Sequence, residues 1–223
     1  MPDALGAEWY RVPIRTRYTP RVDDRPPLRE RKRQRARQEV VAAAYALFAE
    51  RGYAGVTVTD ITDRAEVGRT TFFRYFGDKQ EVVFAGEQEL LDEVRARYEP
   101  VPVQRAPDLR TALELMRGLV LSICAESVVD GENYRLREQL IGDNPELADR
   151  GGRKLDRLVE LARDILRGMR ADQRTAVLAP WLARACFQAG REQAGSDPDA
   201  LTPAVAAAFD ALLGEIGGGV GHP

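Results

Sequence analysis

Apolar residues recur along most of the chain with the three- to four-residue spacing of amphipathic helices. The first such stripe begins near Leu28 and ends before Gly52, a residue type that stops helices. No segment alternates apolar and polar residues as a half-buried strand does, and no internal repeat is visible in the sequence. The pattern therefore predicts an all-α protein of about nine helices.

Two short helices joined by a tight turn are predicted after the first stripe. Thr57 is expected to cap the first of them, with Asp60 three residues later as the acidic half of a capping box. A turn at 66–68 leads into a third helix from Arg69 to Tyr75. This arrangement is typical of a helix-turn-helix unit, which places its second short helix in the major groove of DNA.

Longer helices are predicted in the rest of the chain. Asp78 and Glu81 form a second capping motif, which is expected to open a helix over 78–98. Prolines at 100, 102 and 107 mark a linker. Further stripes lie at 109–124, 144–169, 172–194 and 202–216, and the last is expected to start with Thr202 as its cap and Pro203 as its first residue.

Pro180 lies inside the stripe at 172–194. An interior proline removes one backbone hydrogen bond and crowds the preceding turn, which predicts a kink or a break near Ala176. One alternative is that the helix simply starts later. If it does not, the freed space is expected to line a cavity.

The domain organisation follows from these boundaries. We expect an arm at 1–27, a helix-turn-helix domain at 28–77, a helical ligand-binding and dimerisation domain at 78–216 and a glycine-rich tail at 217–223. The arm contains five prolines and five arginines, and two roles remain open for it. Either its arginines, among them Arg15, Arg17, Arg21 and Arg25, reach into a minor groove, or Trp9, Tyr10 and Ile14 dock it on the protein body.

The charge distribution sharpens this division. The chain has 33 Lys and Arg against 35 Asp and Glu, a net charge of −2. Residues 1–76 hold 15 of the basic and 10 of the acidic residues, a balance of +5, which leaves −7 for residues 77–223. A basic module followed by an acidic body indicates that the first part meets a polyanion such as DNA.

Several classes of protein are disfavoured by composition. The single histidine is His222 in the tail, so neither a Ser-His-Asp triad nor a histidine-ligated zinc has a candidate. Cys124 and Cys186 lack CxxC spacing and are expected to be small core residues. We therefore expect no metal, no cofactor and no enzymatic activity. A helical-bundle enzyme built on Glu126, Asp130 and Glu132 is the weak alternative, because such charge runs are usually solvated faces.

The sequence also bears on location. No apolar run approaches the 18 or so residues needed to cross a bilayer, and the first residues lack a basic-then-apolar signal pattern. We expect a cytoplasmic protein without a membrane partner.

The segment AEVGRTTFFRYFGDK at 65–79 closely resembles the recognition region of the TetR family of bacterial transcription regulators. Residues 47–53 and 57–61 resemble the end of the family's first helix and its second helix. The resemblance implies a homodimer that binds a palindromic operator in double-stranded DNA and is released by a small-molecule effector. Half-sites are then expected about one helical turn, or roughly 34–36 Å, apart.

The residues expected to contact DNA lie on the third helix, at the starts of the second and fourth helices, or on the basic part of the first. They are Arg69, Thr70, Thr71, Phe73, Arg74, Tyr75, Lys79, Thr57, Gly68, Arg33 and Arg37. Arg69 can donate two hydrogen bonds to the edge of a guanine. Thr70 and Thr71 can contact a thymine methyl group or a phosphate. The resemblance implies phosphate contacts for Tyr75, Lys79 and Thr57.

Two positions depart from the family pattern. Gly68 stands where Ser is frequent and Phe73 where Tyr is common, so each loses a hydroxyl. Phe72 and Phe76 are expected to form the core beneath the third helix rather than to touch DNA.

The resemblance further implies an effector pocket in the helical bundle. Its candidate lining residues are Met116, Leu119, Ile123, Tyr134, Arg137, Trp181 and Phe187. The segments at 72–83 and 140–147 also resemble a subgroup with an acyl-CoA-like ligand, whose phosphates would suit arginines at the pocket mouth. Another hydrophobic ligand, such as an aromatic drug, is the alternative, and either would act on the DNA-binding domain through the 78–98 helix.

A dimer interface is expected on the last two helices. Its candidates are Trp181, Val205, Phe209, Leu212, Leu213 and Ile216, although ordinary intrachain core is the simpler interpretation of the same stripe. The favoured function is a ligand-responsive repressor. The alternative is a non-specific or architectural DNA-binding protein without an inducer.

Overall fold

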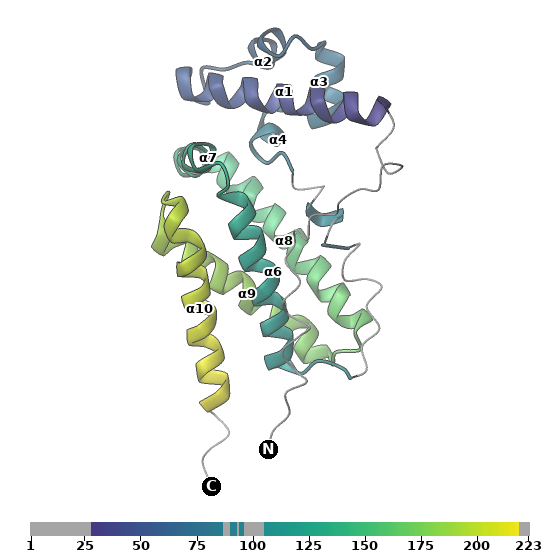
Figure 1. Cartoon of the computed structure of the whole chain (residues 1–223), viewed down its shortest axis with the longest axis vertical. Coiled ribbons are helices and arrows are strands. Elements are labelled where there is room, and N and C mark those ends of the chain that lie inside the picture. The colour runs from purple at the N-terminus through teal and green to yellow at the C-terminus, as the bar shows by residue number, and fades with distance from the viewer. Residues whose placement is uncertain (1–27, 87–89, 93, 96–104, 219–223) are drawn as a thin grey trace. The chain divides into compact units, whose positions relative to one another are not determined.

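The computed structural model describes residues 28–86, 90–92, 94–95 and 105–218. Within these ranges every regular element is a helix, which confirms the predicted all-α class (Figure 1). The described residues divide into two compact units. One unit combines residues 28–86 with residues 139–151, and the other contains the remaining described residues. No helix in these ranges is long and apolar enough to cross a membrane.

Four helices form most of the first unit: α1 (Leu28–Arg51), α2 (Val58–Arg64), α3 (Arg69–Phe76) and α4 (Lys79–Val83). The predicted limits of the first three are confirmed to within a residue or two. Gly52 ends α1 with a φ of 69°, a left-handed conformation that favours glycine. The core of this unit contains Val40, Ala44, Leu47, Phe48, Val56, Ile61, Phe72, Phe76 and Val82.

The predicted cap of α2 is confirmed in both directions. The Asp60 amide donates to the Thr57 hydroxyl at 3.2 Å, and the Thr57 amide donates to the Asp60 carboxylate at 2.8 Å. These bonds satisfy backbone donors that the first turn of a helix leaves without partners. At α4 one half of the predicted motif forms, because the Asp78 side chain accepts from the Glu81 amide at 2.9 Å. The Glu81 carboxylate instead accepts from Arg150 at 2.8 Å.

The prediction of a single helix over 78–98 is wrong. The chain leaves α4 after Val83 in a tight turn, in which the amides of Phe84 and Ala85 donate to carbonyls three residues earlier. Gly86 then adopts a φ of 102°, which an α-helix does not accommodate. Helical backbone resumes at 90–92 and 94–95. Apolar periodicity alone did not reveal this break, because the stripe continues in register on both sides of it.

Five helices supply most of the second unit: α6 (Leu109–Ser127), α7 (Gly131–Asp143), α8 (Pro145–Gly168), α9 (Gln173–Ala194) and α10 (Pro198–Gly218). α10 packs along α9 and α6, and α6 along α9 (Figure 1). The helix α7 had no counterpart among the predicted stripes. Residues 139–151, which end α7 and begin α8, belong to the first unit, so both of these helices are divided between the units.

Two proline-based predictions for the bundle need correction. The helix α9 runs from Gln173 to Ala194 through Pro180, so the predicted break and the later start are both wrong. Pro180 does line a cavity, as expected. α10 begins at Pro198 rather than at Pro203, since the Asp197 carboxylate accepts from the Asp199 amide at 3.0 Å at its start. Proline is favoured in a first helical turn, and the chain contains two candidates only five residues apart.

Two helix backbones approach closely where α9 crosses α10. A Cβ added to Gly190 would stand 2.5 Å from both the N and Cα atoms of Val205, far inside van der Waals contact. Glycine at this position therefore lets two backbones touch. Around the crossing, Ala183, Cys186, Leu201, Val205 and Phe209 are buried.

Candidate nucleic-acid interface and effector cavity

The helix α3 buries one face and exposes the other. Phe72 and Phe76 are buried, with ring centroids 5.5 Å apart, which confirms that they anchor the helix. On the opposite side Arg69, Thr70 and Arg74 are exposed, and Phe73 is 46% exposed, a high value for so large an apolar side chain. Thr71 and Tyr75 lie at the margins and are half-buried. The outer face thus presents two guanidinium groups, a hydroxyl and a bare aromatic ring to the surroundings.

The amino end of α3 is open to an acceptor. Its N-cap is Gly68, which supplies no side-chain hydrogen bond to the first-turn amides. The turn before it is tight, because Glu66 adopts a φ of 53° and the Val67 amide donates to the Thr62 carbonyl at 3.0 Å. First-turn amides without a side-chain cap, next to Arg69, form a site suited to a phosphate or a base edge.

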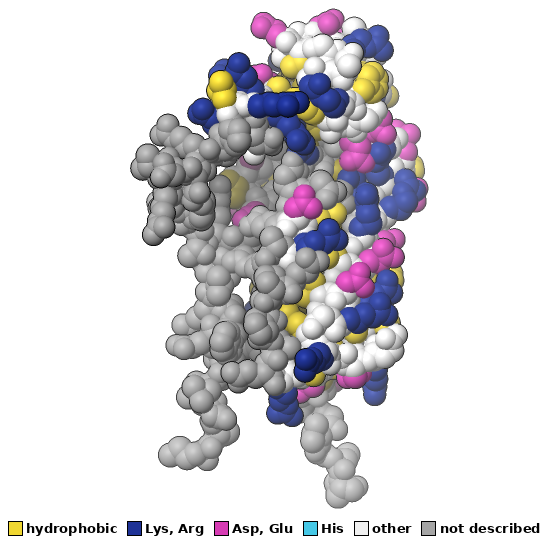
Figure 2. Space-filling model, turned by 90° about the vertical axis from the view of Figure 1, so that its right-hand side faces the viewer, with side chains coloured by type: hydrophobic (Ala, Val, Ile, Leu, Met, Phe, Trp, Pro, Cys, Tyr) yellow, Lys and Arg dark blue, Asp and Glu magenta, His cyan; other side chains and the backbone are white. Residues whose placement is uncertain are grey.

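The first half of α1 carries a cluster of cations, in which Arg29, Arg31, Lys32, Arg33 and Arg35 are exposed. Figure 2 shows Lys and Arg side chains gathered on this unit. Arg37 lies with its guanidinium carbon 5.5 Å from the centre of the Phe76 ring. Burial, and then the charge of Arg33, lower the pKa of Arg37. An anion placed beside this pair would relieve their repulsion.

Lys79 is engaged inside the unit. Its ammonium donates to the carbonyls of Tyr53 and Val56, each at 2.8 Å, and lies 4.0 Å from the centre of the Tyr53 ring. Burial lowers the pKa of Lys79. These contacts hold the loop that precedes Thr57, whose hydroxyl is itself used in the α2 cap. Two side chains expected at DNA phosphates therefore have structural partners in the protein without DNA.

Arg150, at the beginning of α8, holds α4 by a network of its own. Its guanidinium donates to Asp78 and Glu81 at 2.8 Å each and to the Gln80 side chain at 2.6 Å. These hydrogen bonds and charges raise its pKa even though burial opposes them. At the next residue, a Cβ on Gly151 would stand 3.3 Å from the ring of Phe84. The start of α8 is thus fastened to the end of α4 by charge and by close packing.

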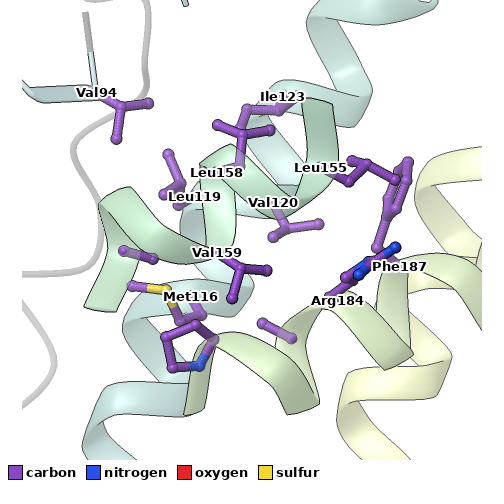
Figure 3. Close-up of a pocket in the computed structure, with 13 residues that line it drawn as sticks. Val94, Met116, Leu119, Val120, Ile123, Leu155, Leu158, Val159, Arg184 and Phe187 are labelled. Carbon is purple, nitrogen blue, oxygen red and sulfur yellow. The ribbon is translucent and has the colours of Figure 1, made fainter. Parts of the chain in front are cut away.

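The second unit contains a cavity of about 100 Å³ (Figure 3). Its walls come from α6, α8 and α9, together with Val94. Twelve of the lining residues are apolar: Val94, Met116, Leu119, Val120, Ile123, Leu155, Leu158, Val159, Ala162, Pro180, Ala183 and Phe187. Arg184 is the thirteenth. Such a cavity suits an apolar ligand with little hydrogen-bonding capacity.

Residues 40–85 match the family model described as bacterial regulatory proteins, tetR family. These residues include the second half of α1, all of α2, α3 and α4, and the start of the turn after α4. Residues 40–85 therefore carry a DNA-binding region of the TetR-family type.

Relatives support this assignment over part of the chain. The HTH-type transcriptional regulator HbdR of Aromatoleum sp. (strain CIB) is 29% identical over 130 residues, 56% of this chain and 54% of HbdR. The HTH-type transcriptional regulator TcmR of Streptomyces glaucescens is 34% identical over 117 residues, 52% of this chain and 48% of TcmR. The chain thus spans about half the length of the curated relatives it matches.

A solved structure supports the fold over a longer stretch. The SmeT–triclosan complex superposes with a TM-score of 0.55 and covers 81% of this chain and 90% of its own. Sequence identity in that comparison is 19%, so the likeness concerns the fold.

The cavity contains four of the seven expected lining residues, namely Met116, Leu119, Ile123 and Phe187. Trp181 lies outside it and is 47% exposed, with the Arg184 guanidinium 5.3 Å from its ring. The α8 wall, Leu155, Leu158, Val159 and Ala162, was missed. In the sequence these α8 residues have the spacing of an ordinary buried stripe. Only the folded structure shows that a cavity lies in front of them.

Tyr134 and Arg137 lie together in a separate polar cluster. The Arg137 guanidinium is 5.4 Å from the Tyr134 ring, and Glu138 accepts from Arg191 at 2.6 Å and pairs with Arg137 at 3.5 Å. Burial raises the pKa of Tyr134 to about 12, and its hydroxyl has no hydrogen-bond partner among the described residues. Neither residue lines the cavity.

The residues expected at a dimer interface separate into two groups. Val205 and Phe209 are fully buried within the chain and Leu213 nearly so, which makes them intrachain core, the simpler interpretation of that stripe. They cannot also contact a second chain without unpacking. Leu212 and Ile216 are half-buried and Trp181 is exposed, so these three retain surface for a partner.

The remaining chemistry of the described residues is limited. Cys124 and Cys186 are buried, unpaired thiols, as predicted, and burial raises the pKa of Cys124 to about 12. A thiol held protonated in this way is a poor nucleophile. Within the part of the chain that the structure describes, no group of three His, Cys, Asp or Glu side chains is placed to hold a metal ion.

Proposed function

We propose that this chain is a sequence-specific DNA-binding transcription regulator of the TetR family that acts as a homodimer on a palindromic operator. The observation that carries the proposal is α3, which is anchored by Phe72 and Phe76 while it exposes Arg69, Thr70 and Arg74 beside an open amino end. A helix of this kind can enter a major groove about 12 Å wide and read base edges there. The cationic start of α1 would bind neighbouring phosphates.

The homodimer part of the proposal rests on α9 and α10. Along α9 the exposed residues Leu178, Trp181 and Ala185 follow helical spacing, and Leu178 is 36% exposed. On α10 the exposed stretch includes Ala207 and Ala211, small residues that allow close helix contact. Pairing these two helices with their symmetry mates would bury Trp181 and place two recognition helices on one operator.

The effector part of the proposal rests on the apolar cavity. SmeT has been solved with triclosan, a small-molecule ligand, and this chain has a cavity among α6, α8 and α9. A ligand that favours a conformer unsuited to DNA would release the operator in proportion to its preference for that conformer. We propose binding, not turnover, as the role of this cavity.

The helix α8 offers a route from the cavity to the DNA-binding unit. Leu155, Leu158 and Val159 line the cavity, and Arg150 on the same helix holds α4. The interruption after Val83 argues against the expected 78–98 helix as a rigid connector. We therefore propose α8 as the connector. An Arg150→Gln variant should keep most of its operator affinity and lose much of its release by an effector, measured by fluorescence anisotropy of labelled DNA.

Footprinting on the DNA that flanks the gene tests the regulator function. A short protected palindrome is expected, with half-sites about one helical turn apart. An unbounded footprint would contradict the proposal and favour the architectural binder, for which the cationic start of α1 is the supporting observation. Triclosan and palmitoyl-CoA, added in turn to the bound complex, would separate an aromatic from an acyl-CoA effector.

Arg69→Ala provides the sharper test of base reading. If Arg69 contacts guanine, its loss should weaken operator binding about tenfold or more and relax the preference at one base pair. Arg64→Ala is a matched control, because Arg64 pairs with Glu50 at 2.8 Å and is not among the residues expected to contact DNA. An equal loss on all sequences would assign Arg69 to a phosphate.

A further inference from the structure

The outer face of α3 carries one large apolar side chain, Phe73, among charged and polar neighbours. Phe73 is 46% exposed, and the other exposed residues of this helix are Arg69, Thr70 and Arg74. Within the described part of the DNA-binding unit, the only other exposed large hydrophobic residue is Leu28, at the start of α1. Single apolar residues are common on protein surfaces, so the position of Phe73, and not its exposure alone, points to a role.

The helical spacing places Phe73 on the same face as the residues expected to read bases. Phe73 follows Arg69 by four positions and Thr70 by three, and residues so spaced are neighbours on a helix surface, with Cβ atoms about 5–6 Å apart. The opposite face of α3 is buried through Phe72 and Phe76. Insertion of the exposed face into a major groove therefore brings in the Phe73 ring one helical turn after Arg69.

A buried neighbour supports the ring of Phe73. The ring centroids of Phe72 and Phe73 lie 5.5 Å apart with their planes at 86°, which is an edge-to-face pair. Phe72 is itself fully buried and packs against Phe76. Phe73 thus presents a supported hydrocarbon surface to the surroundings, and fixing it against DNA costs little additional side-chain entropy.

The chemistry of a phenyl ring limits what Phe73 can recognise in DNA. The ring neither donates nor accepts a conventional hydrogen bond, so it gains nothing from a phosphate or from the polar groups on base edges. The major groove displays one apolar substituent, the 5-methyl group of thymine. We propose that Phe73 contacts this methyl group and makes thymine the preferred base at one position of each half-site. This inference rests on the proposed DNA-binding function and specifies what α3 recognises.

The decisive experiment replaces each thymine of the operator in turn by deoxyuridine, which lacks only the methyl group. The operator is the duplex protected in the footprint, with each replacement made in both half-sites, and the affinity of the full chain is measured by fluorescence anisotropy. One buried methyl group corresponds to about fourfold in affinity, so a replacement in both half-sites should weaken binding about tenfold or more.

Protein variants assign the lost methyl contact to a side chain. Thr70 and Thr71 can also contact a thymine methyl, so deoxyuridine can weaken binding at more than one position. In Phe73→Ala the loss at one symmetry-related pair of thymines should disappear, while losses at other positions remain. Phe73→Tyr keeps the ring and should keep the loss. Val129→Ala is the matched control, because Val129 is 79% exposed on the other unit, and it should behave as the wild type.

A second base substitution separates the methyl group from the hydrogen-bonding pattern of the base pair. At the thymine assigned to Phe73, a pair of 5-methylcytosine with guanine should bind the wild type about fourfold more tightly per half-site than a pair of cytosine with guanine. The two pairs should bind Phe73→Ala equally. Circular dichroism on the same preparations shows whether this variant keeps its helices, as its exposed position leads us to expect.

The outcomes separate this inference from the proposed function. Equal binding of thymine and deoxyuridine operators by the wild type overturns the role of Phe73, and so does an identical pattern of losses in the wild type and Phe73→Ala. Either result, together with a short protected palindrome, leaves the regulator function in place. An unbounded footprint contradicts the regulator function and this inference together.

Discussion

The two units differ in how their structure is specified. In the DNA-binding unit, short-range signals determine each boundary: Thr57 caps α2, Gly52 ends α1, and Asp78 starts α4. In the bundle, the decisive contacts join residues far apart in sequence, such as Gly190 with Val205 and Arg184 with Asp156. The first unit exposes its functional groups and the second encloses a space. A surface site can therefore be recognised from local sequence, whereas a cavity depends on the assembled fold.

The largest effect is expected at the long-range crossing in the bundle. Gly190→Ala should lower the free energy of unfolding by about 3 kcal/mol or more, because its Cβ would meet the backbone of Val205 at 2.5 Å and neither backbone can yield. Urea denaturation monitored by circular dichroism measures the change. Gly118→Ala on α6 is the control. It has open space around its Cβ position, so alanine there should raise stability by up to about 1 kcal/mol.

The next largest effect is expected at Lys79. A substitution there tests whether Lys79 stabilises the fold, as its contacts indicate, or contacts a DNA phosphate. Lys79→Met should lower the free energy of unfolding by about 2 kcal/mol, because it leaves the Tyr53 and Val56 carbonyls without their charged donor. The dependence of DNA affinity on salt should then change little. If the variant keeps its stability and the log-log salt slope falls by about 0.9, Lys79 contacts a phosphate and this part of the comparison fails.

A smaller effect is expected at the local cap of α2. Thr57→Ala removes the acceptor for the Asp60 amide and should cost about 1 kcal/mol of stability in thermal unfolding. Thr57→Ser retains the hydroxyl and should remain close to wild type. A serine variant as unstable as the alanine variant would show that the methyl group, not the cap, carries the effect.

The smallest effect concerns pH and the cap of α6. Hydrogen bonds from Thr111 to Asp108 hold the pKa of that carboxyl below its ordinary value of 3.8. A lowered folded-state pKa stabilises the protein above the ordinary pKa, and this stabilisation is lost as the pH falls through the folded value. Asp108→Asn should therefore lose less melting temperature between pH 5 and pH 3 than the wild type does. Parallel pH curves for the two proteins would contradict this role for Asp108.

The contrast between the units explains what the sequence revealed. The capping box, the turn at 66–68 and the burial of Phe72 and Phe76 were predictable, since each depends on neighbours within a few residues. The break after Val83 was not, because the apolar stripe hides the left-handed Gly86. The structural role of Lys79 also escaped prediction. Its two carbonyl partners lie 23 and 26 residues away in the chain.

Prediction was weaker for the cavity and for the last helices. Four of the seven expected lining residues face the cavity, but Tyr134, Arg137 and Trp181 do not. A helical stripe shows that a side chain is apolar, not whether its neighbours fill the space in front of it. For the same reason Val205 and Phe209 were expected at a dimer interface, although they complete the core of their own chain.

The fastening of α8 to α4 bears on how this chain can be recombined with others. A graft cut in the conventional way, near residue 77, would separate Asp78 and Glu81 from the helix-turn-helix, and a fragment ending at Gly86 would leave both without the guanidinium of Arg150. The unit that holds the recognition helix includes residues 139–151, which come from the middle of the chain. A chimera with a foreign effector domain must therefore carry two pieces of this sequence, the helix-turn-helix segment and residues 139–151. The foreign domain must accept residues 139–151 as an internal insert.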